Sequence, residues 1–301
     1  MKSYLDILRN ILDNGHEKYP TRTLGNVGQV DGSTKTLMLP NVHFEHDMSQ
    51  GYPLLTTKKM AFKTMCVELE GFIQGNTNKQ WYKDRGCNIW NGWANPDLVN
   101  TFRDKNGDEL SKEDKIELQY KLNDLGPIYG AQWRDFNRQG YDQLKYIVST
   151  LKTNPYDRRM VCSAWNPNQF DEMALIPCHT SFNITVYKDI INLFWMQRSV
   201  DGLLGAPFNI ASYALLLVLL AKEANLKPGL LSAMFVDCHL YENQIEVTSE
   251  QLKRTPYELP TIRIPDQLKS GKPFSIFDWT HEDIELIDYK CHPQLKCEVI
   301  V

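Results

Sequence analysis

The sequence predicts a single α+β domain of residues 1–301, built on an antiparallel or mixed sheet with a long buried helix. Three observations carry this prediction. Segments 160–166, 179–187 and 191–199 have the composition and spacing of strands. The apolar run 214–221 is too short to cross a bilayer and therefore indicates a buried helix. Finally, no internal repeat, low-complexity tract or proline-rich linker divides the chain.

The N-terminal part predicts two helices separated by a loop. Apolar residues recur at helical spacing between positions 4 and 12, and Gly15 is a suitable C-cap. Residues 20–40 are rich in Gly, Thr, Asn and Asp and predict a loop. A second helical pattern covers 61–74, with an expected break at Gly71. Residues 95–124 are densely charged and predict a solvent-exposed insertion rather than a separate domain.

The central part predicts a hairpin followed by the buried helix. Strands 179–187 and 191–199 are joined by "KDI", which suits a tight turn. The helix follows in "PFNIASYALLLVLLAKEAN" at 207–225, with Asn209 near its start.

Composition excludes several classes of protein. A net charge of −4 gives no support for a dedicated nucleic-acid surface. The opening "MKSYLDILRN" has acidic and polar residues in its first turns and is no signal peptide. We therefore expect a soluble cytoplasmic protein that has no membrane partner and keeps its thiols reduced.

The chain contains seven cysteines, and Cys178, Cys238 and Cys291 each precede a histidine, which raises the question of zinc. No C-x-x-C or H-x-x-x-H spacing accompanies them, and adjacent residues on a strand point to opposite faces. We expect no metal site.

Cys178 stands out because of its neighbours in the expected hairpin. Pairing 179–187 with 191–199 brings it close to Arg198 and Ser199. A neighbouring guanidinium favours the thiolate, and an arginine beside a serine also suits a phosphate. From these residues alone, a nucleophile beside an anion site and a buried structural cysteine both remain open.

Other residues add possible binding groups. "TRT" and "DRR" supply three further arginines, and His239 and Tyr241 lie on one face of a strand, where they can hold a sugar hydroxyl. Aromatic residues are usually core, but three of them can also wall a site for a flat heterocycle. These are Tyr129, Trp90 and Trp93.

Taken together, the motifs resemble those of the thymidylate synthase family, in the family's order and over nearly the whole chain. They are "YPLLTTKK", "LGPIYGAQWRDF", "DRRMVCSAWNP", "PCHTSFN", "QRSVDGLLGAPFNIASY" and "DCHLYEN". The resemblance implies a three-layer α/β arrangement around a twisted mixed sheet. It also implies a homodimer joined sheet to sheet, in which Arg158 and Arg159 reach into the partner's site.

The resemblance also implies roles for single residues. Cys178 matches the nucleophile, Glu68 a general acid/base, and Tyr129 a group that helps remove a proton from the pyrimidine. Arg22, Arg158, Arg159, Arg198 and Ser199 match the phosphate ligands, His239 and Tyr241 the sugar ligands, and Asn209 the residue that reads the base edge. Trp90, Trp93, Asp201, Gly205, Phe208 and Val301 match the folate side, and Asp201, Asn209 and Arg198 also count among the catalytic residues.

The implied reaction is methylation of deoxyuridine monophosphate (dUMP) to dTMP, with methylenetetrahydrofolate as co-substrate and no metal. Two alternatives remain. One is a hydroxymethylase, in which water rather than hydride completes the reaction. The other is an inactive paralogue that binds nucleotide or RNA. The chain departs from the family at Asn183, Gly71 and Val236, where the family usually has Gln, Trp and Gly.

Overall fold

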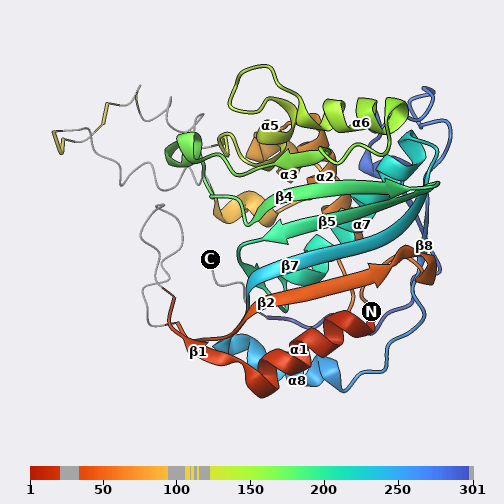
Figure 1. Ribbon diagram of the computed structural model, residues 1–301. Coiled ribbons are helices and arrows are strands. Elements are labelled where there is room, and N and C mark those ends of the chain that lie inside the picture. Colours follow the sequence, from red (N-terminus) through yellow and green to blue (C-terminus); the bar gives the residue numbers. More distant parts are fainter. Residues whose placement is uncertain (21–33, 94–105, 109, 112–113, 115–122, 298–301) are drawn as a thin grey trace.

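The computed structural model describes residues 1–20, 34–93, 106–108, 110–111, 114 and 123–297 (Figure 1). In chain order, the helices and strands are α1 (Lys2–Asn14), β1 (His16–Lys18), β2 (Thr36–Asp47), η1 (Met48–Gln50), α2 (Phe62–Gln74), α3 (Lys79–Asp84), η2 (Ile89–Gly92), α5 (Tyr129–Arg134), α6 (Gln143–Thr153), β3 (Val161–Ser163), η4 (Pro167–Glu172), β4 (His179–Tyr187), β5 (Ile190–Gln197), β6 (Val200–Asp201), α7 (Gly205–Glu223), β7 (Lys227–Tyr241), η5 (Glu242–Gln244), α8 (Ile245–Leu252), β8 (Thr261–Arg263), η6 (His281–Asp283) and β9 (Glu285–Ile287).

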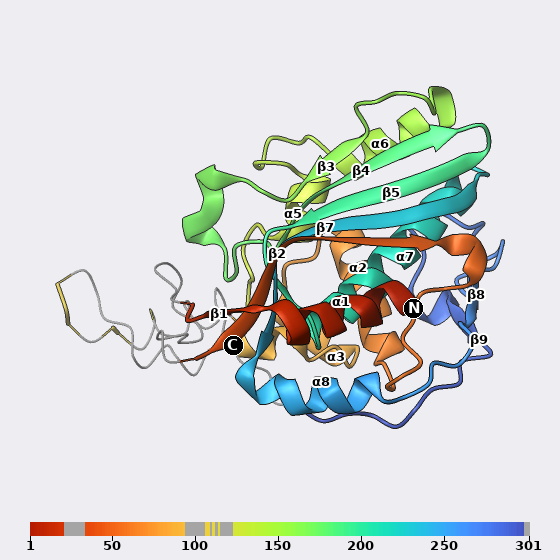
Figure 2. The ribbon, with the colours of Figure 1, turned by 60° about the horizontal axis from the view of Figure 1, so that its bottom comes forward.

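The main sheet is mixed, as the sequence predicts. Its strands follow the order β1-β2-β7-β5-β4-β3, with β6 paired to the end of β7. Neighbours are antiparallel except that β5 and β6 run parallel to β7. The strands twist strongly across the sheet, with α5 and α6 beside β3 and β4, α1 beside β2, and α8 beside α1 (Figures 1 and 2). The α+β class with a twisted mixed sheet is confirmed.

The long helix α7 forms the middle layer. It packs on β5 and β7, and α2 packs against α7. It is the one helix in the described part of the chain that is long and apolar enough to cross a membrane, but 72% of that window is buried within the protein. The predicted buried helix is therefore a core helix, which is consistent with a soluble protein.

The β4–β5 hairpin is close to the prediction. His179 pairs with Gln197, and the turn has Lys188 at φ 53°, in the left-handed region that tight turns use. Gly15 does follow α1, but it is extended at φ −64° rather than left-handed. The first predicted strand, 160–166, is shorter than expected and is β3, Val161–Ser163.

Two expectations about local structure are wrong. Part of the expected loop 20–40 is strand, because β2 begins at Thr36 and pairs with β7 from Thr36 to Asp47. The helix α2 is not broken at Gly71: the helix continues to Gln74, and the ring of Tyr82 fills the space beside this glycine. A Cβ at Gly71 would lie 2.3 Å from that ring, which is a physical reason for glycine there. Most of the charged stretch 95–124 lies outside the described residues.

Candidate active site

Cys178 lies just before β4, partly exposed, at the meeting point of two other segments. Its backbone N–H donates to the hydroxyl of Tyr129 at 2.8 Å, and its carbonyl accepts from the Arg198 N–H at 2.9 Å. The Arg198 Nη2 lies 3.8 Å from the Cys178 sulfur. The predicted closeness of Cys178 and Arg198 is confirmed, because the hairpin register places the start of β4 beside the end of β5.

The guanidinium of Arg198 is held in place by backbone carbonyls. Its Nε donates to Pro177 at 2.9 Å and its Nη2 to Ile176 at 2.7 Å. The guanidinium also lies 5.9 Å from the ring of Trp165. Because Nε and Nη2 both donate to backbone carbonyls, the guanidinium is held beside the sulfur instead of moving freely in solvent.

Asn209 lies in the first turns of α7, and its amide is oriented by a residue that sequence reasoning missed. Gln197 donates to the Asn209 Oδ1 at 2.9 Å and accepts from the Trp195 indole N–H at 3.2 Å. An amide oxygen has two lone pairs, so Asn209 keeps acceptor capacity beside its NH₂ donors. The adjacent His179 is buried, which lowers its pKa to about 4, while the Asn209 side chain opposes part of that shift.

Glu68 is a buried carboxyl on α2. Burial raises its pKa from 4.5 to about 7. The Trp90 indole N–H acts in the opposite direction, although it is buried without the geometry of a hydrogen bond to any described group. A carboxyl in this range can both give and take a proton at neutral pH.

Aromatic rings surround this carboxyl and Tyr129. The Tyr129 ring stacks on Phe72 at 4.9 Å and lies 6.1 Å from Trp90. Burial, and then the nearby Cys178 sulfur, raise the pKa of Tyr129 well above its usual value. Trp93 is partly buried against the same core. Tyr129 and Trp90 therefore lie together within the buried core.

His239 and Tyr241 lie at the end of β7, and their rings meet edge to face at 5.1 Å. The His239 Nδ1 lies 2.8 Å from Asp237 Oδ1, and Lys18 donates to the other oxygen of that carboxylate. The pairing of β6 with β7 brings Asp201 opposite His239.

Asp201 is held by three donors. Its Oδ1 accepts from the N–H groups of Leu203 and Leu204, and its Oδ2 accepts from Gln244 at 2.6 Å. Its carboxylate therefore shapes the turn that leads into α7 at Gly205. Phe208 follows one turn into this helix and packs partly buried against the core.

Lys58 is a buried cation that sequence reasoning did not include among the site residues. Its ammonium donates to the Leu203 carbonyl at 2.6 Å. Burial lowers its pKa to about 8, and the negative charges of Asp201 and Cys297 oppose that shift. The sequence does contain a signal for this residue, because Lys58 lies in the motif "YPLLTTKK". Its burial, however, depends on Leu203, which is 145 positions away.

Not every predicted residue joins this cluster. Arg158 and Arg159 precede β3, whose Val161 pairs with Asn183, so they lie toward the far end of β4 from Cys178. Arg159 is 82% exposed in its ion pair with Asp157. Arg22 and Val301 lie outside the described residues.

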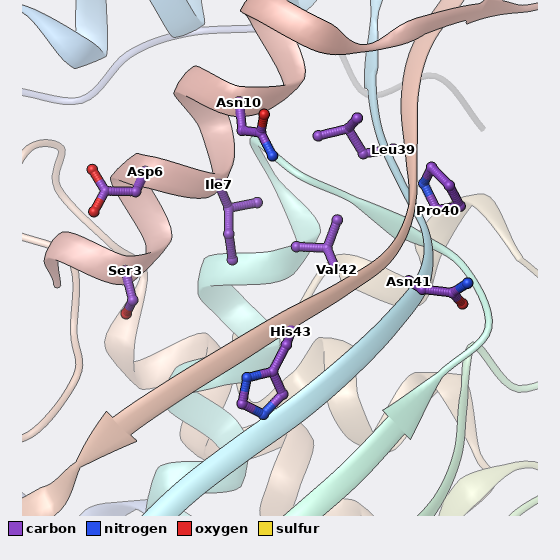
Figure 3. Close-up of a pocket in the computed structure, with 9 residues that line it drawn as sticks. All are labelled: Ser3, Asp6, Ile7, Asn10, Leu39, Pro40, Asn41, Val42 and His43. Atoms are coloured by element: carbon purple, nitrogen blue, oxygen red, sulfur yellow. The ribbon is translucent and has the colours of Figure 1, made fainter.

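Two further observations concern what surrounds the site. The hollow drawn in Figure 3 lies between α1 and residues 39–43 of β2, and none of its lining residues belongs to the cluster around Cys178. Within the described ranges, no three His, Cys, Asp or Glu side chains form a group able to hold a metal ion.

Comparisons with known proteins identify one family over nearly the whole chain. The family model described as thymidylate synthase matches residues 2–301. The chain is 42% identical to a thymidylate synthase of Mycoplasma pneumoniae and 41% identical to one of Mycoplasma genitalium, each over 305 residues and 100% of both chains. It is also 42% identical to a thymidylate synthase of Staphylococcus haemolyticus over 283 residues, covering 85% of this chain and 87% of that relative.

Proposed function

The chain belongs to the thymidylate synthase family, which makes it a methyltransferase, and we propose that it converts dUMP to dTMP. Methylenetetrahydrofolate, the family's co-substrate, would supply the one-carbon unit and the hydride. The observation that carries the proposal is the contact between Cys178 and Arg198. The Tyr129 hydroxyl accepts a hydrogen bond from the backbone N–H of Cys178 at the same place.

The chemistry follows from these residue types. Carbon 5 of a pyrimidine is a poor nucleophile until a thiolate adds at carbon 6 and leaves an enolate. Cys178 is the thiol for that addition, and the Arg198 guanidinium lies 3.8 Å from its sulfur. Tyr129, whose hydroxyl already contacts Cys178, is near enough to help move the proton from carbon 5.

Proton transfer at the rest of the ring is assigned to Glu68. With a pKa of about 7, it exchanges a proton near neutral pH. Asn209, oriented by Gln197, presents both donors and an acceptor to the uracil edge. Arg198, Ser199 and Arg22 would hold the phosphate, and His239 and Tyr241 the sugar.

The residues present fit a flat folate ring. Trp90 is buried, its indole N–H acts on the Glu68 carboxyl, and the Tyr129 ring lies 6.1 Å from its ring. We assign Trp90, Trp93, Asp201, Gly205 and Phe208 to this side of the site, together with Val301. The relatives are thymidylate synthases by name, and for this chain we propose hydride transfer rather than the hydroxymethylase alternative.

A homodimer is the second part of the proposal. On the sheet face away from α7, three side chains of β5 and β7 are exposed: Phe194 (36%), Met196 (40%) and Val236 (39%). Burial of such a face against a second copy is favourable. It would also bring the exposed Arg158 and Arg159 of one chain toward the phosphate site of the other.

We further propose that the chain is one domain and is cytoplasmic. One cluster of buried side chains extends from Tyr4 to Trp279, which supports a single core. All seven cysteines are free, as expected in a reducing compartment.

The test is a turnover assay with dUMP and methylenetetrahydrofolate. We expect a product with the mass of dTMP and one dihydrofolate per turnover, followed by its absorbance. Cys178→Ala should bind dUMP and give no product. A product one oxygen heavier, without dihydrofolate, would identify the hydroxymethylase. Binding of dUMP without turnover by the parent would favour the inactive paralogue.

A further inference from the structure

Three charged or titratable side chains form a line at the sugar end of the site. Lys18 lies on β1, and its ammonium crosses β2 to reach Asp237 on β7, with Nζ 2.5 Å from Oδ2. The other oxygen of Asp237 lies 2.8 Å from the Nδ1 of His239. Burial alone would raise the pKa of Asp237, but the hydrogen bonds from His239 and Lys18 outweigh it and lower that pKa.

This arrangement determines which nitrogen of His239 faces a ligand. A carboxylate only accepts hydrogen bonds, so Nδ1 must carry its hydrogen toward Asp237. In the neutral ring, Nε2 is then an acceptor. An acceptor at that position takes the hydrogen of a hydroxyl group.

We propose that Asp237 is a positioning residue that holds His239 with Nε2 as an acceptor for the sugar 3′-hydroxyl. Lys18 fixes which way the side chain of residue 237 is oriented, and so fixes the direction of the hydrogen bond to His239. The inference rests on the proposed function, because it names the group that reads the sugar of dUMP. On this inference, the preference for a 3′-hydroxyl depends on Lys18, Asp237 and His239 together rather than on His239 alone.

Lys18 has a specific part in fixing this direction. An ammonium can only donate, so it always draws an oxygen of residue 237 toward itself. In Asp237→Asn, the amide oxygen should therefore face Lys18, and the amide NH₂ should face His239. Nδ1 would then have to accept, its hydrogen would move to Nε2, and the acceptor for the 3′-hydroxyl would be lost.

The experiment compares two ligands by calorimetry, dUMP and 2′,3′-dideoxyuridine monophosphate, which lacks the 3′-hydroxyl. The parent should bind dUMP more tightly. Asp237→Asn should raise the Kd for dUMP roughly two- to tenfold, as expected for one lost hydrogen bond. The Kd for the dideoxy ligand should change less than about twofold, since no hydroxyl is there to lose.

The double variant Lys18→Met/Asp237→Asn separates an effect on hydrogen-bond direction from a general effect of the substitution on packing. Without the ammonium, the amide can turn its oxygen toward His239, so the preference for dUMP should return at least in part. Asp189→Asn is the matched control, because it alters an aspartate–lysine pair between the β4–β5 turn and the start of β7, at Lys227, and should leave both Kd values unchanged.

The outcomes are distinguishable. Equal weakening of both ligands by Asp237→Asn, or no recovery in the double variant, would show that Asp237 is only structural. Equal affinity of the parent for the two ligands would also overturn the inference while leaving dUMP turnover intact. A parent that does not bind dUMP at all would overturn the proposed function and this inference together.

Discussion

Single residues in the site owe their chemistry to their surroundings more than to their type. Burial moves the pKa of Glu68 up to about 7 and that of His179 down to about 4, so the same cause favours the uncharged form of both side chains. Beside them, Arg198 is a fixed positive charge held by carbonyl groups. The Cys178 sulfur thus lies beside a fixed cation.

Glu68 gives a prediction about stability. Between pH 4.5 and 7 the folded protein keeps a proton on Glu68 that the unfolded chain has released. The folded state therefore loses stability as the pH rises through this window. Glu68→Gln has no carboxyl to ionise, so it does not lose stability in this way. Its free energy of unfolding should equal that of the parent below pH 4.5 and exceed it by about 3 kcal/mol above pH 7.

Denaturant unfolding of parent and variant at pH 4.5 and pH 8 checks this. The exposed Glu258→Gln is the control and should show no such difference between the two pH values. If the difference in free energy of unfolding between Glu68→Gln and the parent does not depend on pH, burial does not hold the proton on Glu68.

Asn209 gives a prediction about base choice. In Asn209→Asp, one carboxylate oxygen still accepts from Gln197, and the other replaces the NH₂ donor. That oxygen can accept from the amino group of cytosine but repels the oxygen of uracil. The mismatch should cost about 1–3 kcal/mol, so kcat/KM for dUMP should fall and that for dCMP should rise. An unchanged preference would place base reading elsewhere.

At the scale of elements, the site is assembled where four of them end or begin. The β4–β5 hairpin supplies Cys178 and Arg198, the start of α5 supplies Tyr129, and the start of α7 supplies Asn209. The helix α2, which packs against both α5 and α7, supplies Glu68. Small shifts between these elements would separate the side chains, so their packing matters for the chemistry.

The contact between α2 and α3 gives an element-scale prediction. Gly71→Ala would place a Cβ 2.3 Å from the Tyr82 ring, and this overpacking should destabilise the protein by about 1–3 kcal/mol. In a Tyr82→Leu background the ring is gone, and the same alanine should cost much less.

Thermal unfolding of the four proteins in this cycle measures the coupling between the two positions. Additive effects would show that the α2–α3 contact adapts without strain. In that case, the Tyr82 ring would not be the reason for glycine at position 71.

At the scale of the whole molecule, the sheet presents two different faces. One is covered by α7, and the other exposes Phe194, Met196 and Val236. The arginines expected to complete the phosphate site lie toward the far end of β4 from Cys178 of their own chain. Both features agree with a dimer that shares its sites.

Mixing two inactive variants tests the shared site. Cys178→Ala removes the nucleophile, and a double change of Arg158 and Arg159 to alanine removes the guanidinium groups. Hybrid dimers contain one site with every part, so the mixture should regain up to about a quarter of parental activity, as random exchange of chains predicts. An active monomer in sedimentation would rule out sharing.

The sequence by itself determined the elements whose signal is local. Alternation along 179–187 and 191–199 and the apolar run at 214–221 identify the hairpin and the buried helix, because such periodicity is carried by contiguous residues. The hairpin in turn predicts the Cys178–Arg198 contact, since pairing of adjacent strands leaves few registers. The resemblance to a family added roles for residues, and the family itself is confirmed.

Only the tertiary structure decided the features that depend on distant residues. Thr36–Leu39 are strand rather than loop because β7, some 200 positions later, pairs with them. Gln197 orients Asn209, Lys18 reaches Asp237 across β2, and Lys58 is buried against Leu203. Burial and hydrogen-bond partners come from packing between remote segments, and they determine protonation and orientation, which no local pattern encodes.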